Sequence, residues 1–100
     1  MPLLFRFAGD EELQGLYLNM GMDAHTQLIE SARASAGQYP LIRRLSEYYR
    51  DSSFDVDELP ALIEELAAIQ QCVEHQDIAN FKVLCEEANA SRVGVEVDCD

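Results

Sequence analysis

The sequence predicts one α+β domain, predominantly helical, in which four to five helices pack on a small sheet formed by N- and C-terminal strands. Three observations predict this class. The 100 residues leave room for a single core, so residues 1–100 form one domain. Apolar residues recur at helical spacing through most of the chain, whereas a short apolar run stands near each terminus. With 48% hydrophobic and 26% charged residues, the chain has the composition of a folded protein.

Two strands are predicted, one near each terminus. The run PLLFRFA (2–8) is rich in aromatic and aliphatic residues and is followed by Gly9. The run RVGVEVD (92–98) alternates valines with glycine or acidic residues, which is typical of a strand with one buried face. We expect the two strands to pair with each other.

The stretch DEELQGLYLNMG (10–21) is compatible with two structures. Its apolar residues follow helical spacing behind a candidate N-cap at Asp10. However, Leu16, Leu18 and Met20 also alternate as they would in a strand. We expect a helix here and keep the strand as the alternative.

Four further helices are predicted, each with an apolar stripe and a suitable residue at its start. Asp23 can cap the first, and Pro40 suits the first turn of the second. Asp57 fits as the N-cap of the third, and Gln76 or Asp77 as that of the fourth. The predicted ranges are 23–37, 39–51, 57–74 and 76–90.

The net charge of −12 is distributed unevenly. Residues 1–50 sum to −1, whereas residues 51–100 sum to −11. Such a field repels nucleic-acid phosphates and anionic lipids, so we expect neither nucleic acid nor a membrane as a partner. It attracts a basic protein, although acidic residues also serve simply to keep a small protein soluble.

The sequence favours the cytoplasm. The first residues, MPLLFRFAGDEE, are not typical of a secretory signal, because no basic region precedes the short apolar run and acids follow it. No run approaches the roughly 18 apolar residues that a membrane-spanning helix needs. Three cysteines, an odd number, argue against a disulfide framework and favour a reducing compartment.

The stretch CVEHQD (72–77) places a thiol and an imidazole three residues apart. On a helix, Cys72 and His75 would share a face, as pairs of metal ligands do. A zinc site would then need Cys85 and Cys99 as well, and this spacing matches no tetrahedral site that geometry supports. We therefore interpret the stretch as a turn between two helices.

The stretch DSSFDVDEL (51–59) spaces its oxygen atoms as a calcium loop does. Val56 stands where the tight turn of such a loop needs glycine, and Leu62 where it needs a glutamate ligand. The sequence also contains no nucleophile elbow, zinc-protease helix or phosphate-binding glycine loop. We expect no metal, no cofactor and no catalytic residue, and hence no enzyme.

Charged neighbours in the predicted helices are expected to lie in solvent. The adjacent acids at 64–65 and 86–87 point about 100° apart on a helix, so neither pair can form a catalytic dyad. The arginines at 43–44 are expected to form exposed ion pairs with Glu47 or Asp51.

The segment YPLIRRLSEYYRDSSFDVDELPALIEELAAI (39–69) resembles an arrangement found in small bacterial proteins. In that arrangement a Tyr-rich helix is followed by an acidic loop and by a helix with the pattern ELxxLxxEL. Some of these proteins resemble immunity proteins, which neutralise a toxin made by a neighbouring or sibling cell. The resemblance covers about a third of the chain and implies a binding function without assigning a role to any residue.

The leading hypothesis is therefore a non-enzymatic binding protein of the inhibitor or immunity kind. It would attract a basic protein, such as a toxin, to its acidic surface and occlude the partner's site. The candidate partner-binding residues are Asp51, Asp55, Asp57, Glu58, Glu64, Glu65, Tyr48 and Tyr49. Two alternatives stay open: a small acidic chaperone or adaptor acting as a homodimer, and a small metal-binding protein or enzyme.

Overall fold

The computed structural model describes residues 3–10, 12–34, 39–46 and 52–99. These residues form an α+β fold, and no helix among them is long and apolar enough to cross a membrane. The elements, with η for a 3-10 helix, are β1 (Leu3–Phe7), β2 (Tyr17–Met20), α1 (Met22–Ala34), η1 (Ile42–Ser46), β3 (Ser52–Phe54), η2 (Val56–Glu58), α2 (Leu59–Gln70), α3 (Gln76–Ala90) and β4 (Val95–Cys99).

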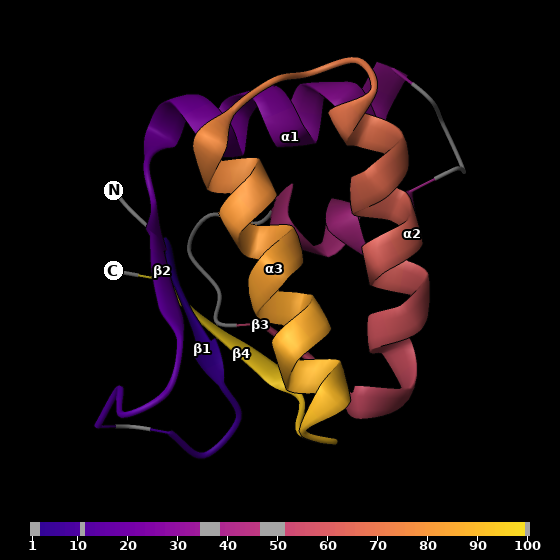
Figure 1. The fold of residues 1–100 in the computed structure, drawn as a ribbon. Coiled ribbons are helices and arrows are strands. Elements are labelled where there is room, and N and C mark those ends of the chain that lie inside the picture. The colour runs from indigo at the N-terminus through magenta and orange to yellow at the C-terminus, as the bar shows by residue number, and fades with distance from the viewer. Residues whose placement is uncertain (1–2, 11, 35–38, 47–51, 100) are drawn as a thin grey trace.

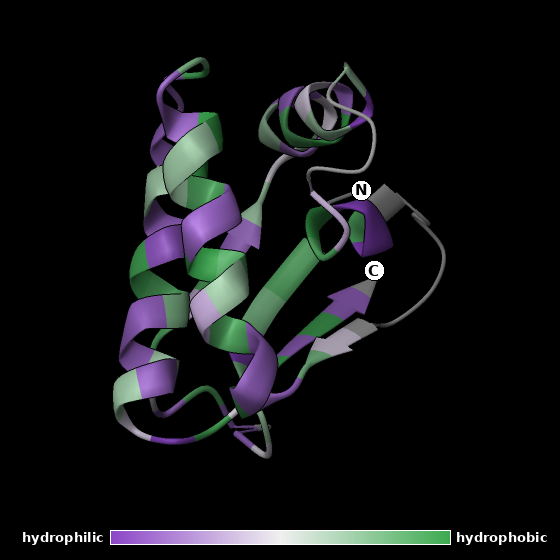
Figure 2. Ribbon diagram, turned by 90° about the vertical axis from the view of Figure 1, so that its right-hand side faces the viewer, coloured by the Kyte–Doolittle hydropathy of each residue, from purple (hydrophilic) through white to green (hydrophobic). Residues whose placement is uncertain are grey.

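The elements form two layers (Figures 1 and 2). One layer is a four-stranded antiparallel sheet in the order β2-β1-β4-β3. The other layer consists of helices on one face of the sheet, with α3 against β1 and β2 and with α2 antiparallel beside α3. The predicted pairing of the N- and C-terminal strands is confirmed, because β1 and β4 are the central pair of the sheet.

The inner face of the sheet forms one wall of the core. Leu3 and Phe5 of β1 and Val95 and Val97 of β4 point inward and are buried, as the alternation of a strand requires. The ring of Phe5 meets that of Phe81 on α3 edge to face, with the ring centroids 4.3 Å apart. This contact joins the centre of the sheet to the helical layer.

The outer face of the sheet carries a cluster of ion pairs. Arg6 in β1 lies opposite Glu96 in β4, and Asp98 stands two residues further along that strand. The Arg6 guanidinium lies 2.6 Å from the Glu96 carboxylate and 2.9 Å from that of Asp98. Only 9% of Arg6 is exposed, and its hydrogen bond to Asp98 raises its pKa. Two acids of the negative half of the chain are therefore paired with one arginine on the sheet.

The main helices lie close to their predicted ranges. The helix α3 spans the predicted residues 76–90, and α1 covers 23–34 of the predicted 23–37, begins one residue earlier at Met22, and leaves 35–37 outside the described residues. The helix α2 contains Pro60 in its first turn, as predicted, but it begins at Leu59 and is preceded by η2. The predicted N-cap at Asp57 is wrong, because this residue lies inside η2.

In the stretch 10–21, apart from residue 11, which lies outside the described residues, the chain forms a loop and the strand β2, so the expected helix is wrong. The Asp10 carboxylate accepts backbone hydrogen bonds within the loop and caps no helix. Leu13 has a φ of 57°, which lies in the left-handed region and interrupts a right-handed helix. Leu18 and Met20 are buried on the inner face of β2, so the alternating pattern was the correct signal.

The expected four to five α-helices are not confirmed. The described residues contain three α-helices and two 3-10 helices. Of the predicted helix 39–51, residues 42–46 form η1, and 47–51 lie outside the described residues. The stretch that the sequence indicated as an acidic loop begins with β3, because these residues pair with β4.

Gly94 allows the close approach of β3. A Cβ atom on Gly94 would lie 2.6 Å from the Phe54 carbonyl oxygen, and the Gly94 carbonyl is held by the N–H of Ala8 at 2.9 Å. We predict that Gly94→Ala lowers the free energy of unfolding by about 1–3 kcal/mol, measured by urea denaturation. Gly21→Ala, whose Cβ meets nothing within 4 Å, is the control and is expected to change it by less than about 0.5 kcal/mol. Equal midpoints for both variants would refute the close approach.

Candidate functional site

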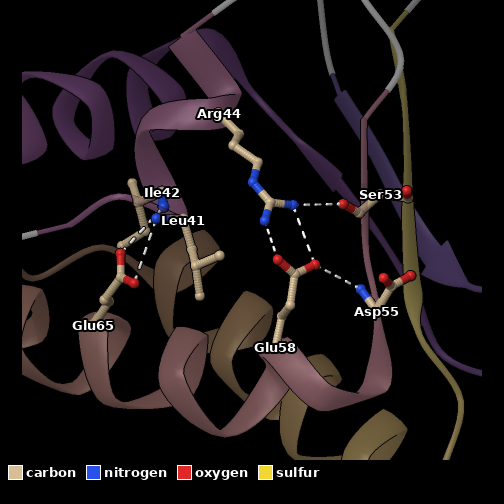
Figure 3. Close-up of polar contacts among 7 residues, drawn as sticks. All are labelled: Leu41, Ile42, Arg44, Ser53, Asp55, Glu58 and Glu65. Atoms are coloured by element: carbon tan, nitrogen blue, oxygen red, sulfur yellow. Dashed lines mark hydrogen bonds and ion pairs between the residues drawn. The ribbon is translucent and has the colours of Figure 1, made fainter.

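The junction between β3 and α2 is held by Arg44 of η1 (Figure 3). The Arg44 guanidinium forms an ion pair with the Glu58 carboxylate and donates a hydrogen bond to the Ser53 carbonyl oxygen at 3.1 Å. Glu58 in turn accepts a hydrogen bond from the backbone N–H of Asp55 at 3.0 Å. The bonds from Arg44 and Asp55 lower the pKa of Glu58. The junction is therefore fixed by polar contacts from three successive segments.

Arg44 has a partner that the sequence did not indicate, Glu58. The sequence indicated Glu47 or Asp51, both of which lie beyond the residues that the structure describes. Arg44 pairs with Glu58, and its guanidinium also lies over the Phe54 ring, 5.3 Å from the centroid. Glu58, a predicted partner-binding residue, therefore has an internal cation beside it.

Glu65 is buried, which corrects the prediction that it lies on a solvated helix face. Only 9% of the residue is exposed. Its carboxylate accepts hydrogen bonds from the backbone N–H groups of Ile42 at 3.2 Å and Leu41 at 3.4 Å (Figure 3). Burial raises the pKa of Glu65, and these two hydrogen bonds act in the opposite direction. Glu65 thus joins α2 to the start of η1.

His25 holds the other end of η1, a role that the sequence analysis missed. Its imidazole is buried on α1, and Nε2–H donates a hydrogen bond to the Leu45 carbonyl oxygen at 2.6 Å. Burial lowers the pKa of His25, so the neutral ring with the proton on Nε2 fits this position. The spacing of His25 from Leu28, Ile29 and Ala32 would have placed it on the buried face of the helix.

Three of the predicted acids remain exposed. Asp55 and Asp57 line a groove at the end of β3 and β4, and no ion pair involves either within the described part of the chain. The groove is lined by Ala8, Ser53, Phe54, Asp55, Val56, Asp57, Gly94, Val95 and Glu96. Glu64 is exposed on α2 and lines a second groove with Tyr39 and Pro40. We call Asp55, Asp57 and Glu64 the acidic edge.

The remaining predicted contact residues cannot be placed. Asp51, Tyr48 and Tyr49 lie outside the described residues. The structure therefore brings Asp55 and Asp57 to one groove, puts Glu64 on a neighbouring surface, and assigns Glu58 and Glu65 to internal contacts.

The chain turns between α2 and α3 at residues 71–75, as predicted, and the rest of the stretch 72–77, Gln76 and Asp77, belongs to α3. His75 is the N-cap of α3, because its Nδ1 atom accepts a hydrogen bond from the Asp77 N–H at 3.1 Å. This corrects the predicted caps, Gln76 and Asp77. Cys72 is exposed, whereas Cys85 is buried in the core, where burial raises the pKa of its thiol. Among the described residues, no three His, Cys, Asp or Glu side chains gather as metal ligands would.

Comparisons of the chain with protein-family models, with curated proteins and with solved structures found no match. Any function must therefore be argued from the residues themselves.

Glu65 and its neighbour Glu64 provide a matched pair for testing the internal role of Glu65. We predict that Glu65→Ala lowers the free energy of unfolding by about 1–3 kcal/mol, because the Ile42 N–H loses its acceptor in a buried position. Glu64→Ala, at an exposed position on the same helix, is expected to change it by less than about 0.5 kcal/mol. Thermal and urea unfolding measure both values. Similar losses in the two variants would contradict the assignment.

His25 predicts a pH dependence of stability. Its pKa in the folded state lies below the ordinary 6.5, so the unfolded chain binds the proton more readily. The free energy of unfolding should therefore decrease as pH falls below 6.5, by at most about 1.4 kcal/mol per pH unit. Glu65, with its raised pKa, contributes a slope of opposite sign closer to pH 4.5.

His25→Gln isolates this effect, because the glutamine amide can still donate to Leu45 but does not titrate. We expect the variant to lose the decrease between about pH 7 and 5.5, measured by urea denaturation at each pH. The assignment to His25 is wrong if the variant keeps the slope of the parent protein.

Proposed function

We propose that this chain is a non-enzymatic acidic binding protein of the inhibitor or immunity kind, which neutralises a basic protein partner. One observation supports this above the others. The acids on the outer face of the sheet are paired with Arg6, whereas Asp55 and Asp57 are exposed at the junction of β3 and α2, and Glu64 is exposed on α2. Their negative charge is directed to solvent.

Electrostatic attraction supplies the first step of the proposed mechanism. A net charge of −12 accelerates the approach of a cationic protein, and the effect weakens as salt screens it.

Occlusion of the partner's site is the second step. The groove beside Asp55 and Asp57 can accept a lysine or arginine side chain of the partner, and Glu64 extends the contact along α2. We exclude Glu58 and Glu65 from direct contact and retain Asp51, Tyr48 and Tyr49 on sequence grounds alone.

The junction suits this task because it is rigid before binding. Arg44 ties Glu58 and the Ser53 carbonyl together, so the loop that carries Asp55 and Asp57 needs little further ordering when a partner arrives. We place the protein in the cytoplasm, where Cys72 and Cys85 stay reduced. A toxin of the producing cell or of its neighbours is the partner class that the sequence resemblance suggests.

A second candidate function is an acidic chaperone or adaptor that acts as a homodimer. The observation that favours it is a group of exposed apolar side chains along β2, at the opposite edge of the sheet from β3.

The acidic edge can be tested with two variants of equal net charge. The first combines Asp55→Asn, Asp57→Asn and Glu64→Gln. The control combines Glu30→Gln, Glu74→Gln and Glu87→Gln at exposed positions elsewhere. The parent chain and each variant are immobilised on a resin and incubated with an extract of the source cell. The captured proteins are identified by mass spectrometry. We expect a basic protein on the parent chain and on the control but at least about tenfold less on the edge variant.

The purified partner then gives the rate of association as a function of salt. We expect the rate to fall by at least about tenfold between low and high salt for the parent chain, and less steeply for the edge variant. Equal losses of capture in both variants would mean that only total charge matters. An association rate that is independent of salt would exclude electrostatic attraction as the mechanism.

A further inference from the structure

Four large apolar side chains are exposed among the described residues, and all four lie in β2 or close to it. Leu16 is 46% exposed, Tyr17 52%, Met22 52% and Val83 on α3 49%. Leu16, Tyr17 and Val83 line one groove between β2 and α3, and Met22 follows two residues after the end of β2. Residues 16–22 together with Asn80 and Val83 are called the β2 strip below. Exposed apolar side chains that gather in one groove, as Leu16, Tyr17 and Val83 do, are a candidate contact with another molecule.

The strand itself is open to pairing. β2 is an edge strand, and in the described part of the chain it pairs only with β1 (Figure 1). Edge strands of monomeric proteins are commonly protected by charged side chains, proline or bulges. The stretch LQGLYLNMGM (13–22) contains no charged residue and no proline. β2 therefore lacks the residues that usually prevent the addition of another strand.

The charge of the molecule decides which occupant fits. The chain has 19 acids among 100 residues, so two copies that met through most surfaces would bring carboxylates together. The residues of the β2 strip are uncharged, and its Asn80 accepts a hydrogen bond from the Gln76 side chain on α3 at 2.9 Å. One carboxylate lies against the strip, that of Asp77, which accepts a hydrogen bond from the Gly21 N–H at 3.4 Å. A basic partner would meet fewer exposed carboxylates here than at the acidic edge. The neutral strip is complementary to another neutral strip.

An antiparallel strand edge is also complementary to itself. Under a two-fold axis, the free N–H and C=O groups of β2 in one copy can pair with those of β2 in the second. We infer that the β2 strip is a homodimer interface, in which the two sheets join through their β2 strands and Leu16, Tyr17 and Val83 of each copy are covered by the other. The proposal does not depend on the basic partner, because β3 and the acidic edge lie at the opposite edge of the sheet.

The proposed dimer has a distinctive response to salt. Asp10 and Glu12 precede the strip and Asp23 follows it, so carboxylates of the two copies come near each other at its ends. Salt screens this repulsion and strengthens burial of apolar surface. Dimerisation is therefore expected to tighten as salt rises, whereas association with a basic partner weakens. The two proposals can fail independently for this reason.

The test is sedimentation equilibrium of the purified chain alone over a concentration series, at low and high salt. We expect a monomer–dimer equilibrium that tightens with salt. Val83→Glu should raise the dissociation constant at least about tenfold, because it places like charges across the two-fold axis. Ala61→Glu, an equal change in charge at an exposed position of α2, should leave the dissociation constant within about twofold.

The circular dichroism spectrum and melting temperature of Val83→Glu are measured alongside, and they should match those of Ala61→Glu because both sites are exposed. If Val83→Glu fails to fold, Leu16→Glu is used in its place, because Leu16 lies in the loop before β2 and is also exposed. A chain that stays monomeric at every concentration and salt overturns the proposal. The proposal is also overturned if Val83→Glu and Ala61→Glu raise the dissociation constant of the dimer equally. If the chain is a monomer and Val83→Glu abolishes capture of a basic protein, the β2 strip is a contact for that partner instead.

Discussion

The structure depends on how two buried polar side chains hold the segment that contains η1. Glu65 of α2 binds the N–H groups at the start of this segment, and His25 of α1 binds the Leu45 carbonyl near its end. The side chains of Ile42 and Leu45 can then fill the core, where both are buried. Because a 3-10 helix of five residues provides few hydrogen bonds of its own, these contacts from two different helices fix its position.

The same segment positions the charged surface. Arg44 extends from η1 to Glu58 and the Ser53 carbonyl, so the core contacts determine where the β3–α2 junction lies. Two groups of acids in the described part of the second half consequently differ in their surroundings. Glu58, Glu96 and Asp98 form ion pairs with arginines of the first half, whereas the acidic edge is exposed. The total charge alone would not have distinguished these groups.

Local patterns in the sequence predicted the terminal strands and α3, because periodicity and capping act over a few neighbouring residues. These local patterns failed where contacts with residues distant in the sequence determine the burial of a side chain or the choice between helix and strand. Glu64 and Glu65 are equivalent in sequence, and only the position of residues 41–42, more than 20 residues away, buries one of them. The sequence of residues 10–21 matched both the helical and the strand spacing of apolar residues. Residues 17–20 form a strand because they pair with β1. Likewise, β3 is too short to show a pattern and exists because β4 lies beside it.

The central position of β1 and β4 has a consequence for how the chain folds. Phe5 and Val97 are neighbours in the sheet but are separated by most of the sequence, so their pairing closes a very long loop. The hairpin of β1 and β2 and the pair of α2 and α3 involve much shorter loops and can form earlier. Until β4 arrives, β1 exposes an apolar edge with Arg6 unpaired. The sheet is thus completed late, and its slowest step joins the segments that end up deepest within it.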